Sequence, residues 1–346
     1  MSQAKAVSLI SGGLDSLLAT KVVMEQGVHV EGINFFTGFC VEGQTHAVRK
    51  RHEEKSKRNN ALWVAETLGI KLHIIDIVDE YKDVMLNPKH GYGTNMNPCL
   101  DCKIFMVHKA QQWIEKNAFD FIITGEVVGQ RPMSQRKDTM PVVARESGAQ
   151  ARLLRPLSAK NLPATLAEEQ GWIKRDAMHG FSGRNRKPQI ALAAQYGFED
   201  YATPAGGCCS LTDVNYSNKL VDLWQARGKR DYEMDDLMLL KVGRHIRPRP
   251  HFKLIVGREA GENNYLQGYA KMFTSLKTSS HNGPLVLLDG VANDDDLLLA
   301  ARITARFSQG KAAEKVTVET RRDNGEEKAF DVAPLPLSEL KKEWYL

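Results

Sequence analysis

The segment Ser11-Gly12-Gly13-Leu14-Asp15-Ser16 combines residue types that bind a phosphorylated ligand. Its two adjacent glycines let the backbone turn tightly and approach an anion closely. Ser11 and Ser16 can donate hydroxyl hydrogen bonds, whereas Asp15 repels a bare phosphate and so indicates an intervening magnesium ion. An apolar run precedes the segment and a helical pattern follows it, which is where open α/β sheets bind anions.

Other phosphate-binding loops fit this segment less well. A Walker A loop requires a lysine, and a dinucleotide fingerprint requires glycines spaced as G-x-G-x-x-G; the segment has neither. A structural interpretation also stays open, in which Asp15 and Ser16 cap a helix after a tight turn. The loop by itself therefore indicates an anion site without excluding a simple turn.

The five cysteines form a second set of reactive side chains. Cys99 and Cys102 have the spacing of a metal site, Cys208 and Cys209 are adjacent, and Cys40 is interpreted as structural. Side chains of neighbouring residues diverge, so three thiolate ligands with one thiol left over are favoured. Three interpretations stay open: a cluster with one iron free to carry sulfide, a persulfide resolved through a disulfide, and a zinc or structural set of thiols.

Strand and helix patterns alternate around these residues. The expected strands cover residues 6–10, 28–36, 71–78 and 121–124, and the expected helices cover 14–25, 46–68 and 104–116. This alternation predicts a doubly wound parallel sheet with helices on both faces.

The pattern changes after Pro156. We expect helices over 161–170, 187–196 and 294–307, an irregular connector over 201–207, strands over 252–256, 284–288 and 315–319, and then a charged tail. These features predict three parts. They are an α/β catalytic domain over 1–180, a helical, cysteine-containing extension over 181–245, and a smaller α+β domain over 246–346.

Composition and charge limit the class of protein. The 346 residues are 42% hydrophobic and 26% charged, as in an ordinary globular protein, with a net charge of +5. Residues 131–187 hold twelve Lys and Arg against five Asp and Glu, which suits a polyanion partner or a solvated basic face. No apolar run approaches about 18 residues and no signal-peptide pattern is present, so we expect a cytoplasmic protein with no membrane contact.

The segment SGGLDS resembles the pyrophosphate-binding loop of the PP-loop ATP pyrophosphatases, whose fold is that of the adenine nucleotide alpha hydrolases. Those enzymes cleave ATP between the α- and β-phosphates, adenylate a substrate oxygen, and let a nucleophile displace AMP. The resemblance implies ATP and Mg²⁺ as ligands. The implied ATP-binding residues are Ser11, Gly12, Gly13, Leu14, Asp15, Ser16, Gly125 and Gln130.

Four further segments resemble the tRNA-thiolating branch of these enzymes: NPCLDCK, TGEVVGQRPMSQ, LLRPLSAK and TPAGGCCSLTD. The second is most similar to 4-thiouridine synthetases that modify uridine 8 of tRNA, and implies that Glu126, Gln130 and Gln135 shape the substrate pocket. The cysteines are similar to those of iron–sulfur-dependent tRNA sulfurases. That similarity implies a [4Fe-4S] cluster on Cys99, Cys102 and Cys208, with Cys209 as the alternative third ligand.

The sequence therefore predicts an ATP-dependent tRNA sulfurase whose catalytic residues are Asp15, Cys99, Cys102 and Cys208. Free sulfide or a cysteine desulfurase is the expected sulfur source. No cysteine follows Cys209, which favours the cluster over a rhodanese-type relay. The alternatives are a persulfide-dependent thiolase, a zinc-containing PP-loop ligase that uses ammonia, and an RNA-binding protein with an inactive nucleotide fold.

A tRNA substrate needs basic side chains that contact its phosphates. Residues 243–266 resemble RNA-binding domains of ribosome-associated proteins and supply some of them. The expected RNA contacts are Arg131, Arg136, Lys137, Arg184, Arg186, Lys187, Arg247 and Arg249, with Arg152, Arg155, Arg244, His245 and Lys253 as further candidates. Each of them can instead pair with a nearby carboxylate.

Overall fold

A computed structural model describes residues 3–40, 58–202 and 208–346 of the chain. The chain divides into two compact units. The described part of the first unit runs to Thr212, and that of the second runs from Asp213 to Leu346. The predicted boundaries at residues 180 and 245 stay predictions.

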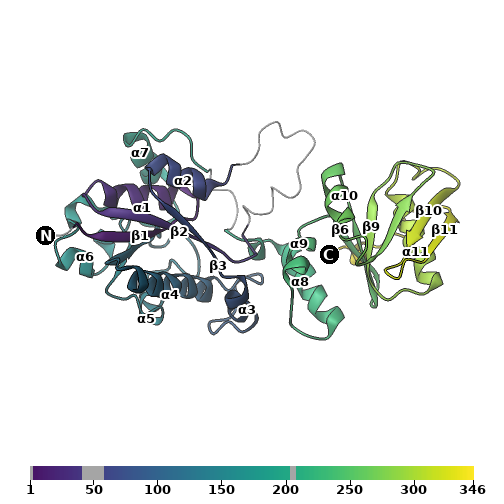
Figure 1. The fold of residues 1–346 in the computed structure, drawn as a ribbon, viewed down its shortest axis with the longest axis horizontal. Helices are drawn as coiled ribbons and strands as arrows, with labels where there is room; N and C mark the ends of the chain where they lie inside the picture. Colours follow the sequence, from purple (N-terminus) through teal and green to yellow (C-terminus); the bar gives the residue numbers. More distant parts are fainter. Residues whose placement is uncertain (1–2, 41–57, 203–207) are drawn as a thin grey trace. The chain divides into compact units, whose positions relative to one another are not determined.

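The first unit is built on a parallel sheet with the strand order β3-β2-β1-β4-β5. Its strands are β1 (Lys5–Leu9), β2 (His29–Phe36), β3 (Leu72–Asp76), β4 (Phe121–Ile123) and β5 (Leu153–Leu154). Its helices are α1 (Leu14–Met24), α2 (Asn60–Leu68), α3 (Val78–Leu86), α4 (Cys99–Asn117), α5 (Met140–Glu146), α6 (Leu166–Glu169) and α7 (Lys187–Gln195). The predicted doubly wound parallel fold is confirmed (Figure 1).

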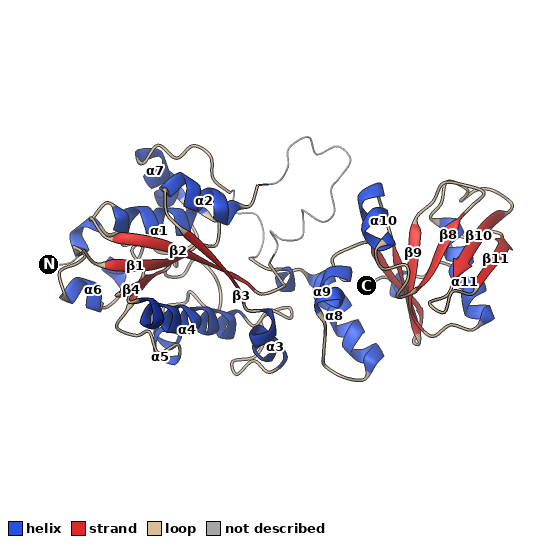
Figure 2. Ribbon diagram, in the orientation of Figure 1, coloured by secondary structure: helices blue, strands red, loops and turns tan. Residues whose placement is uncertain are grey.

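Two apolar cores hold helices against opposite faces of this sheet. In β1, Ala6 packs in the core that α1, α2 and α7 share, and its neighbour Val7 packs in the core formed with α4 and α5. Successive strand residues face opposite sides, so a short strand buried on both faces is apolar throughout. Figure 2 shows the resulting layers of helix, sheet and helix.

Two helices of the first unit begin at residues other than those predicted. Residues 46–57 of the predicted helix 46–68 lie outside the described residues. In the described part of this segment α2 begins at Asn60, because the Asn59 side chain accepts hydrogen bonds from the amides of Ala61 and Leu62. The predicted helix 104–116 begins earlier, at Cys99. Both cysteines of the Cys99–Cys102 pair therefore lie in the first turn of α4.

The predicted helix over 161–170 is reduced to the four residues of α6. A capping box formed by Thr165 and Glu168 starts this helix, and Gly171 follows with a positive φ of 70°. The predicted connector over 201–207 falls mostly outside the described residues.

The second unit contains an antiparallel sheet with the strand order β11-β10-β8-β9-β7-β6. Its strands are β6 (Arg244–Arg249), β7 (Phe252–Val256), β8 (Thr274–Thr278), β9 (Leu285–Gly290), β10 (Val316–Arg321) and β11 (Glu327–Val332). Its helices are α8 (Val214–Arg227), α9 (Met234–Leu239), α10 (Ala260–Gln267) and α11 (Asp294–Arg306). Alternate residues of β9 enter two cores, one shared with α11 and the other with α9 and α10.

The predicted α+β character of this unit is confirmed. The expected charged tail is wrong in part, because residues 327–332 form the edge strand β11. Charged side chains conceal this strand in the sequence, since an edge strand has a solvent-facing side on which charge is favoured. No helix in the described parts of the chain is long and apolar enough to cross a membrane.

Candidate functional site

The loop between β1 and α1 has the geometry of an anion cradle. Gly12 has a φ of +78°, which favours glycine, and Gly13 precedes the first helical turn with no side chain capping it. The Ser16 hydroxyl donates to the Gly13 carbonyl at 2.8 Å. The structural alternative, in which Asp15 and Ser16 cap the helix, is therefore wrong. An uncapped first turn directs backbone N–H groups toward any anion placed there.

Gly125 is packed against the backbone of this loop. A Cβ atom at Gly125 would lie 2.5 Å from the carbonyl carbon and oxygen of Asp15 and 2.6 Å from the Ser16 amide nitrogen. No side chain fits there without moving the loop. The TGEVVGQ segment after β4 thus contacts the SGGLDS segment after β1, as expected for strands that are neighbours in a parallel sheet.

Asp15 is held through one of its two carboxylate oxygens. Gln130 Nε2 donates to Asp15 Oδ2 at 2.6 Å, and Arg186 Nη2 lies 3.8 Å from the same oxygen. Asp15 Oδ1 is buried and has no hydrogen-bond partner. Burial raises the pKa of this carboxyl, although Gln130, Arg186 and Arg131 act in the opposite direction. A buried, unpartnered carboxylate oxygen beside an uncapped helix start is suited to a bound cation.

Glu126 lies directly after Gly125 and is buried. Thr124 Oγ1 donates to Glu126 Oε2 at 2.9 Å and Arg155 Nε donates to it at 3.1 Å, whereas Oε1 has no partner. Burial favours the neutral acid, but the charge and hydrogen bond of Arg155 outweigh it and hold the pKa of Glu126 below its usual value. Arg155 is itself buried in this pair, so its predicted RNA contact is wrong.

The structure brings the two cysteine pairs together. Cys99 and Cys102 lie in the first turn of α4, and Cys208 interacts electrostatically with both thiols. Burial, followed by the nearby Cys208, raises the pKa of Cys102 to about 12, while the Tyr81 hydroxyl donates a hydrogen bond to its sulfur. Asn97 Nδ2 donates to Cys99 Sγ at 3.1 Å. Residues more than 100 positions apart in the sequence therefore share one thiol site.

Cys208 is the most acidic of these thiols. A hydrogen bond from the Cys209 thiol, with the charges of Arg131 and Lys103, lowers the pKa of Cys208 to about 6. The same hydrogen bond and burial raise the pKa of Cys209. The two adjacent thiols thus share one hydrogen bond, which favours the thiolate of Cys208. The choice of Cys208 over Cys209 as the third ligand stays a prediction.

Cys40 lies closer to these thiols than the sequence indicates. Cys40 and Cys209 form an isolated antiparallel bridge, and the Ser210 amide donates to the Phe39 carbonyl at 2.9 Å. This pattern makes Cys40 and Cys209 a non-hydrogen-bonded pair of an antiparallel bridge. The side chains of such a pair lie closer together than those of a hydrogen-bonded pair. The structural role predicted for Cys40 stays a prediction, and the bridge places this residue beside Cys209.

One cation, Arg131, acts on both the thiols and the loop, and a second, Lys103, acts on the thiols and on Glu126. Arg131 interacts electrostatically with Asp15 and also with Cys99 and Cys208. Lys103 interacts with Glu126 and with the thiols of Cys99, Cys102 and Cys208. The uncapped loop and the cysteines thus belong to one site and share the positive charge of Arg131.

The thiol chemistry is compatible with a [4Fe-4S] cluster, because thiolates are the usual ligands of such clusters and the nearby cations would offset their charge. Within the described residues, no group of three or more His, Cys, Asp or Glu side chains is positioned to hold a metal ion. The cluster therefore stays a prediction.

The sequence missed three residues of this site. Gln189, in α7, donates from Nε2 to Gln130 Oε1 at 2.7 Å and is fully buried. Lys103 follows Cys102 directly and shares a helix face with Cys99, a spacing that could have identified it. Tyr81, on the short helix α3, has no motif that marks it.

The residues of the first unit that were predicted to contact RNA differ in their exposure and in their partners. Arg131 and Arg186 lie at Asp15, and Arg136 pairs with Asp138 at 2.7 Å. The exposed residues of the set are Arg136, Lys137, Arg184 and Lys187. Their contact with RNA stays a prediction.

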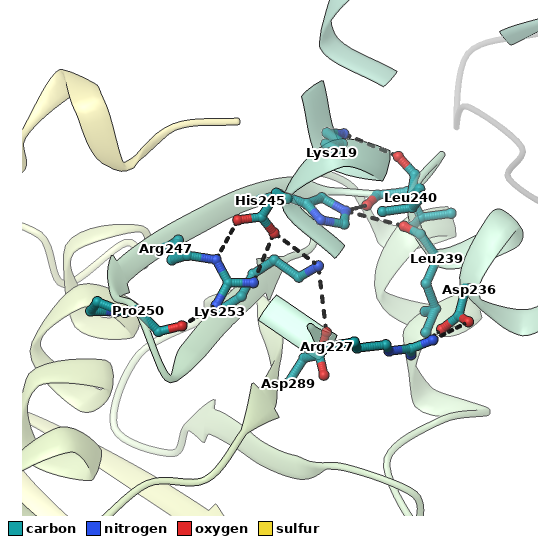
Figure 3. A network of polar contacts seen from close by, with 12 residues as sticks. Lys219, Arg227, Asp236, Leu239, Leu240, His245, Arg247, Pro250, Lys253 and Asp289 are labelled. Carbon is teal, nitrogen blue, oxygen red and sulfur yellow. Dashed lines mark hydrogen bonds and ion pairs between the residues drawn. The ribbon is translucent and has the colours of Figure 1, made fainter. Parts of the chain in front are cut away.

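In the second unit several predicted contacts are buried. Arg247 forms a two-pronged hydrogen bond with Asp222, and Lys253 Nζ lies 3.6 Å from Asp222 and 3.4 Å from Asp289 (Figure 3). His245 Nε2 contacts the carbonyls of Leu239 and Val242. Lys253 and His245 are each 1% exposed, so their predicted direct contact with RNA is wrong. Arg244 and Arg249 are exposed, although Arg249 also pairs with Asp296.

Known protein families match two separate parts of the chain. Residues 1–163 match the family model described as thiamine biosynthesis protein (ThiI), and residues 243–345 match the NFACT protein RNA binding domain. The resemblance to tRNA-thiolating PP-loop enzymes and to an RNA-binding domain is confirmed.

Curated relatives match the first unit only in part. A tRNA-specific 2-thiouridylase MnmA of Campylobacter curvus is 29% identical over 36% of this chain and 35% of its own length. A probable tRNA sulfurtransferase of Thermococcus kodakarensis is 28% identical over 42% of this chain and 35% of its own. The chain thus spans about a third of the length of these relatives.

Among solved structures, a 4-thiouridine synthetase–RNA complex with bound ATP covers 57% of this chain and 54% of that chain, with 20% identity and a TM-score of 0.34.

Proposed function

We propose that this chain is an ATP-dependent tRNA sulfurase that replaces a carbonyl oxygen of a uridine with sulfur. The observation that carries the proposal is Arg131, which interacts electrostatically with Asp15 and also with Cys99 and Cys208. An enzyme that activates a carbonyl with ATP and then replaces its oxygen with sulfur needs those two sites adjacent.

In the first step the uridine oxygen attacks the α-phosphorus of ATP, and the bond to the β-phosphate oxygen breaks. Pyrophosphate leaves, accepted by the amides of the Ser11–Ser16 loop. Asp15 Oδ1 is the protein oxygen available to a Mg²⁺ ion on the phosphates. Stabilising the charge on the departing pyrophosphate is the main contribution of this loop.

In the second step a sulfur nucleophile attacks the adenylated carbon and AMP leaves with the original oxygen, so the carbonyl becomes a thiocarbonyl. Cys99, Cys102 and Cys208 would hold a [4Fe-4S] cluster, which when bound supplies an iron site for hydrosulfide. Lys103 and Arg131 keep an anionic sulfur species close to these thiols. Free sulfide or a cysteine desulfurase supplies the sulfur, and 4-thiouridine at position 8 is the proposed product.

The second unit would hold the tRNA. Its match to an RNA-binding family and its exposed Arg244 and Arg249 support this role. Shape and phosphate contacts, rather than base edges, are the expected basis of recognition in folded RNA. A cytoplasmic location is part of the same proposal.

Anaerobic purification followed by iron and sulfide analysis is the first test. About four irons and four sulfides per chain are expected. ATP, sulfide and unmodified tRNA are then added, and thiouridine is measured by mass spectrometry. Zinc without thiolation would favour an ammonia-using ligase, and thiolation without iron would favour a persulfide on one of the thiols.

Two variants separate the two halves of the site. D15A should lose AMP formation and keep its iron, whereas C99A should lose iron and keep ATP binding. Thiolation by D15A at the wild-type rate would refute the assignment of the ATP site. No pyrophosphate release from the wild-type protein with any tRNA would leave only an RNA-binding role.

A further inference from the structure

Asp15 is connected to helix α7 by a chain of two buried amides. Gln189 Nε2 donates to Gln130 Oε1 at 2.7 Å, and Gln130 Nε2 donates to Asp15 Oδ2 at 2.6 Å. Gln130 is 7% exposed and Gln189 is fully buried. The three side chains come from α1, from the segment after β4 and from α7, so three separate elements meet at one carboxylate.

Both hydrogen bonds that connect Gln189, Gln130 and Asp15 have a defined direction. An ionised carboxylate only accepts, so Gln130 must present its NH₂ group to Asp15. The carbonyl oxygen of Gln130 then faces Gln189, which must present its own NH₂ group. Turning either amide over would place two acceptors against each other. The orientation of Gln189 therefore fixes that of Gln130, and Gln130 fixes Asp15.

This arrangement has a cost that packing alone does not explain. With its NH₂ group used on Gln130, Gln189 has an Oε1 atom that is buried without a partner. A buried polar atom without a partner destabilises the fold, and an apolar side chain of the same size would avoid it. A glutamine that lowers stability while holding a ligand-binding carboxylate is typical of a functional site.

Helix α7 lies beyond residue 163, where the match to the ThiI family model ends. It also follows Arg186, whose guanidinium is the cation 3.8 Å from Asp15 Oδ2. Two residues from this one segment, Arg186 and Gln189, thus act on the same oxygen of Asp15, one by charge and one through Gln130.

We infer that α7 is a positioning element of the nucleotide site, in which Gln189 orients Gln130 so that Asp15 is held through Oδ2 with Oδ1 left for the ligand. The inference rests on the proposed function, because the ligand of Asp15 is the metal-bound triphosphate. Gln189 is a positioning residue: it orients Gln130 by its hydrogen bond, and its side chain also lowers the pKa of Asp15 by hydrogen bonding.

The test uses the full-length protein and measures AMP formation from ATP in the presence of tRNA. Q189M keeps the size of the side chain and removes its hydrogen bond; we expect the KM for ATP to rise about tenfold, as for a lost hydrogen bond to a binding group. Q189E reverses the polarity at Gln130, so we expect a larger rise, about 100-fold. Gln195 is exposed on the same helix, and Q195M is the matched control with an unchanged KM.

The KM separates positioning from a general loss of structure, because a smaller folded fraction lowers the apparent kcat without moving the KM. Q189M should also keep or raise the midpoint of thermal unfolding, since it removes an unpartnered oxygen. A lowered midpoint with an unchanged KM would overturn the inference, as would wild-type values of both.

A double-mutant cycle tests whether Gln189 acts through Gln130. In a Q130M background the further change Q189M should raise the KM clearly less than it does in the wild-type background, because one of the two partners of Gln189 is gone. Independent, multiplying effects would overturn the inference. If the wild-type protein and Q195M form no AMP and pyrophosphate with any tRNA, the proposed function fails instead, and the two failures are thus distinguishable.

Discussion

Each unit contains a buried network of carboxylates, amides and cations, and the two networks differ in one respect. In the second unit, Asp222 uses both oxygens on Arg247, and Lys253 adds contacts to Asp222 and Asp289. In the first unit, Asp15 uses one oxygen, and its other oxygen is buried without a partner. Both networks join segments that are distant in the sequence.

The difference indicates what each network is for. A buried ion pair whose members are all satisfied has no atom left for a ligand, so its role is to hold elements together. A buried carboxylate with one unpaired oxygen has lost solvation without full compensation, and a ligand can supply the missing partner. Glu126, with its unpartnered Oε1, belongs with Asp15 in this respect.

Among variants that test the difference between the two networks, D15N is expected to have the largest effect. The asparagine keeps the shape of Asp15 and removes its charge, so the rate of pyrophosphate release should fall about 1,000-fold. Stability should hold or rise, because the variant no longer buries an under-solvated charge. Pyrophosphate assays and thermal unfolding measure both; a large loss of stability would show Asp15 to be structural, like Asp222.

The matching change in the second unit is D222A, for which the opposite result is expected. It leaves Arg247 without its carboxylate and Lys253 with Asp289 alone, so the free energy of unfolding of this unit should fall by about 3 kcal/mol. Chemical denaturation measures this loss. ATP binding by the first unit should stay within twofold of wild type. D222N, which keeps hydrogen-bonding capacity, should lose less; equal activity losses in D15N and D222A would break the comparison.

The sequence was sufficient for most of the first unit, because strands buried on both faces are short continuous apolar runs, whereas amphipathic helices repeat their apolar residues about every 3.6 positions. Strands β1, β2 and β4 were each predicted to within one residue at either end. Strand β5 has two residues and is too short to produce a pattern. In the second unit β11 was missed because three of its six residues, Glu327, Lys328 and Asp331, are charged.

Motif spacing placed Ser11–Ser16 and the TGEVVGQ segment at one sheet edge, and Gly125 confirms that they touch. Spacing could not show that Gln189 reaches Asp15 or that Cys40 opposes Cys209, because both contacts depend on three-dimensional packing between distant segments. It also could not separate exposed from paired arginines. Arg155 and Arg247 are paired because a carboxylate from another element lies beside each, and no local pattern reports that.

A smaller effect is expected at the contact between the two motif segments. G125A places a methyl group 2.5 Å from the Asp15 backbone, so the loop must move by a large fraction of an ångström. ATP affinity should fall about tenfold, since close positioning decides the strength of contacts to the phosphates. Calorimetric titration with ATP and Mg²⁺ measures it. The matched control is G148A, at a surface turn where a Cβ has open space, although the positive φ costs some stability there. Equal ATP affinity in G125A and wild type would show that the loop tolerates displacement.

The smallest expected effect is a dependence of the stability of the second unit on pH. Burial, with the charges of Lys219 and Lys253, holds the pKa of His245 well below 6.5, so the folded state keeps this ring neutral. Below pH 6.5 the unfolded chain binds a proton that the folded chain does not. The free energy of unfolding therefore decreases as the pH is lowered, by up to about 1.4 kcal/mol per pH unit. The carboxylates with lowered pKa in this unit are Glu262, Asp294, Asp296 and Asp331, and they lose their contribution only below about pH 4.5. Between pH 7.5 and 5.5 the free energy of unfolding should therefore fall less in H245Q than in wild type, and parallel curves would show that His245 does not control this window.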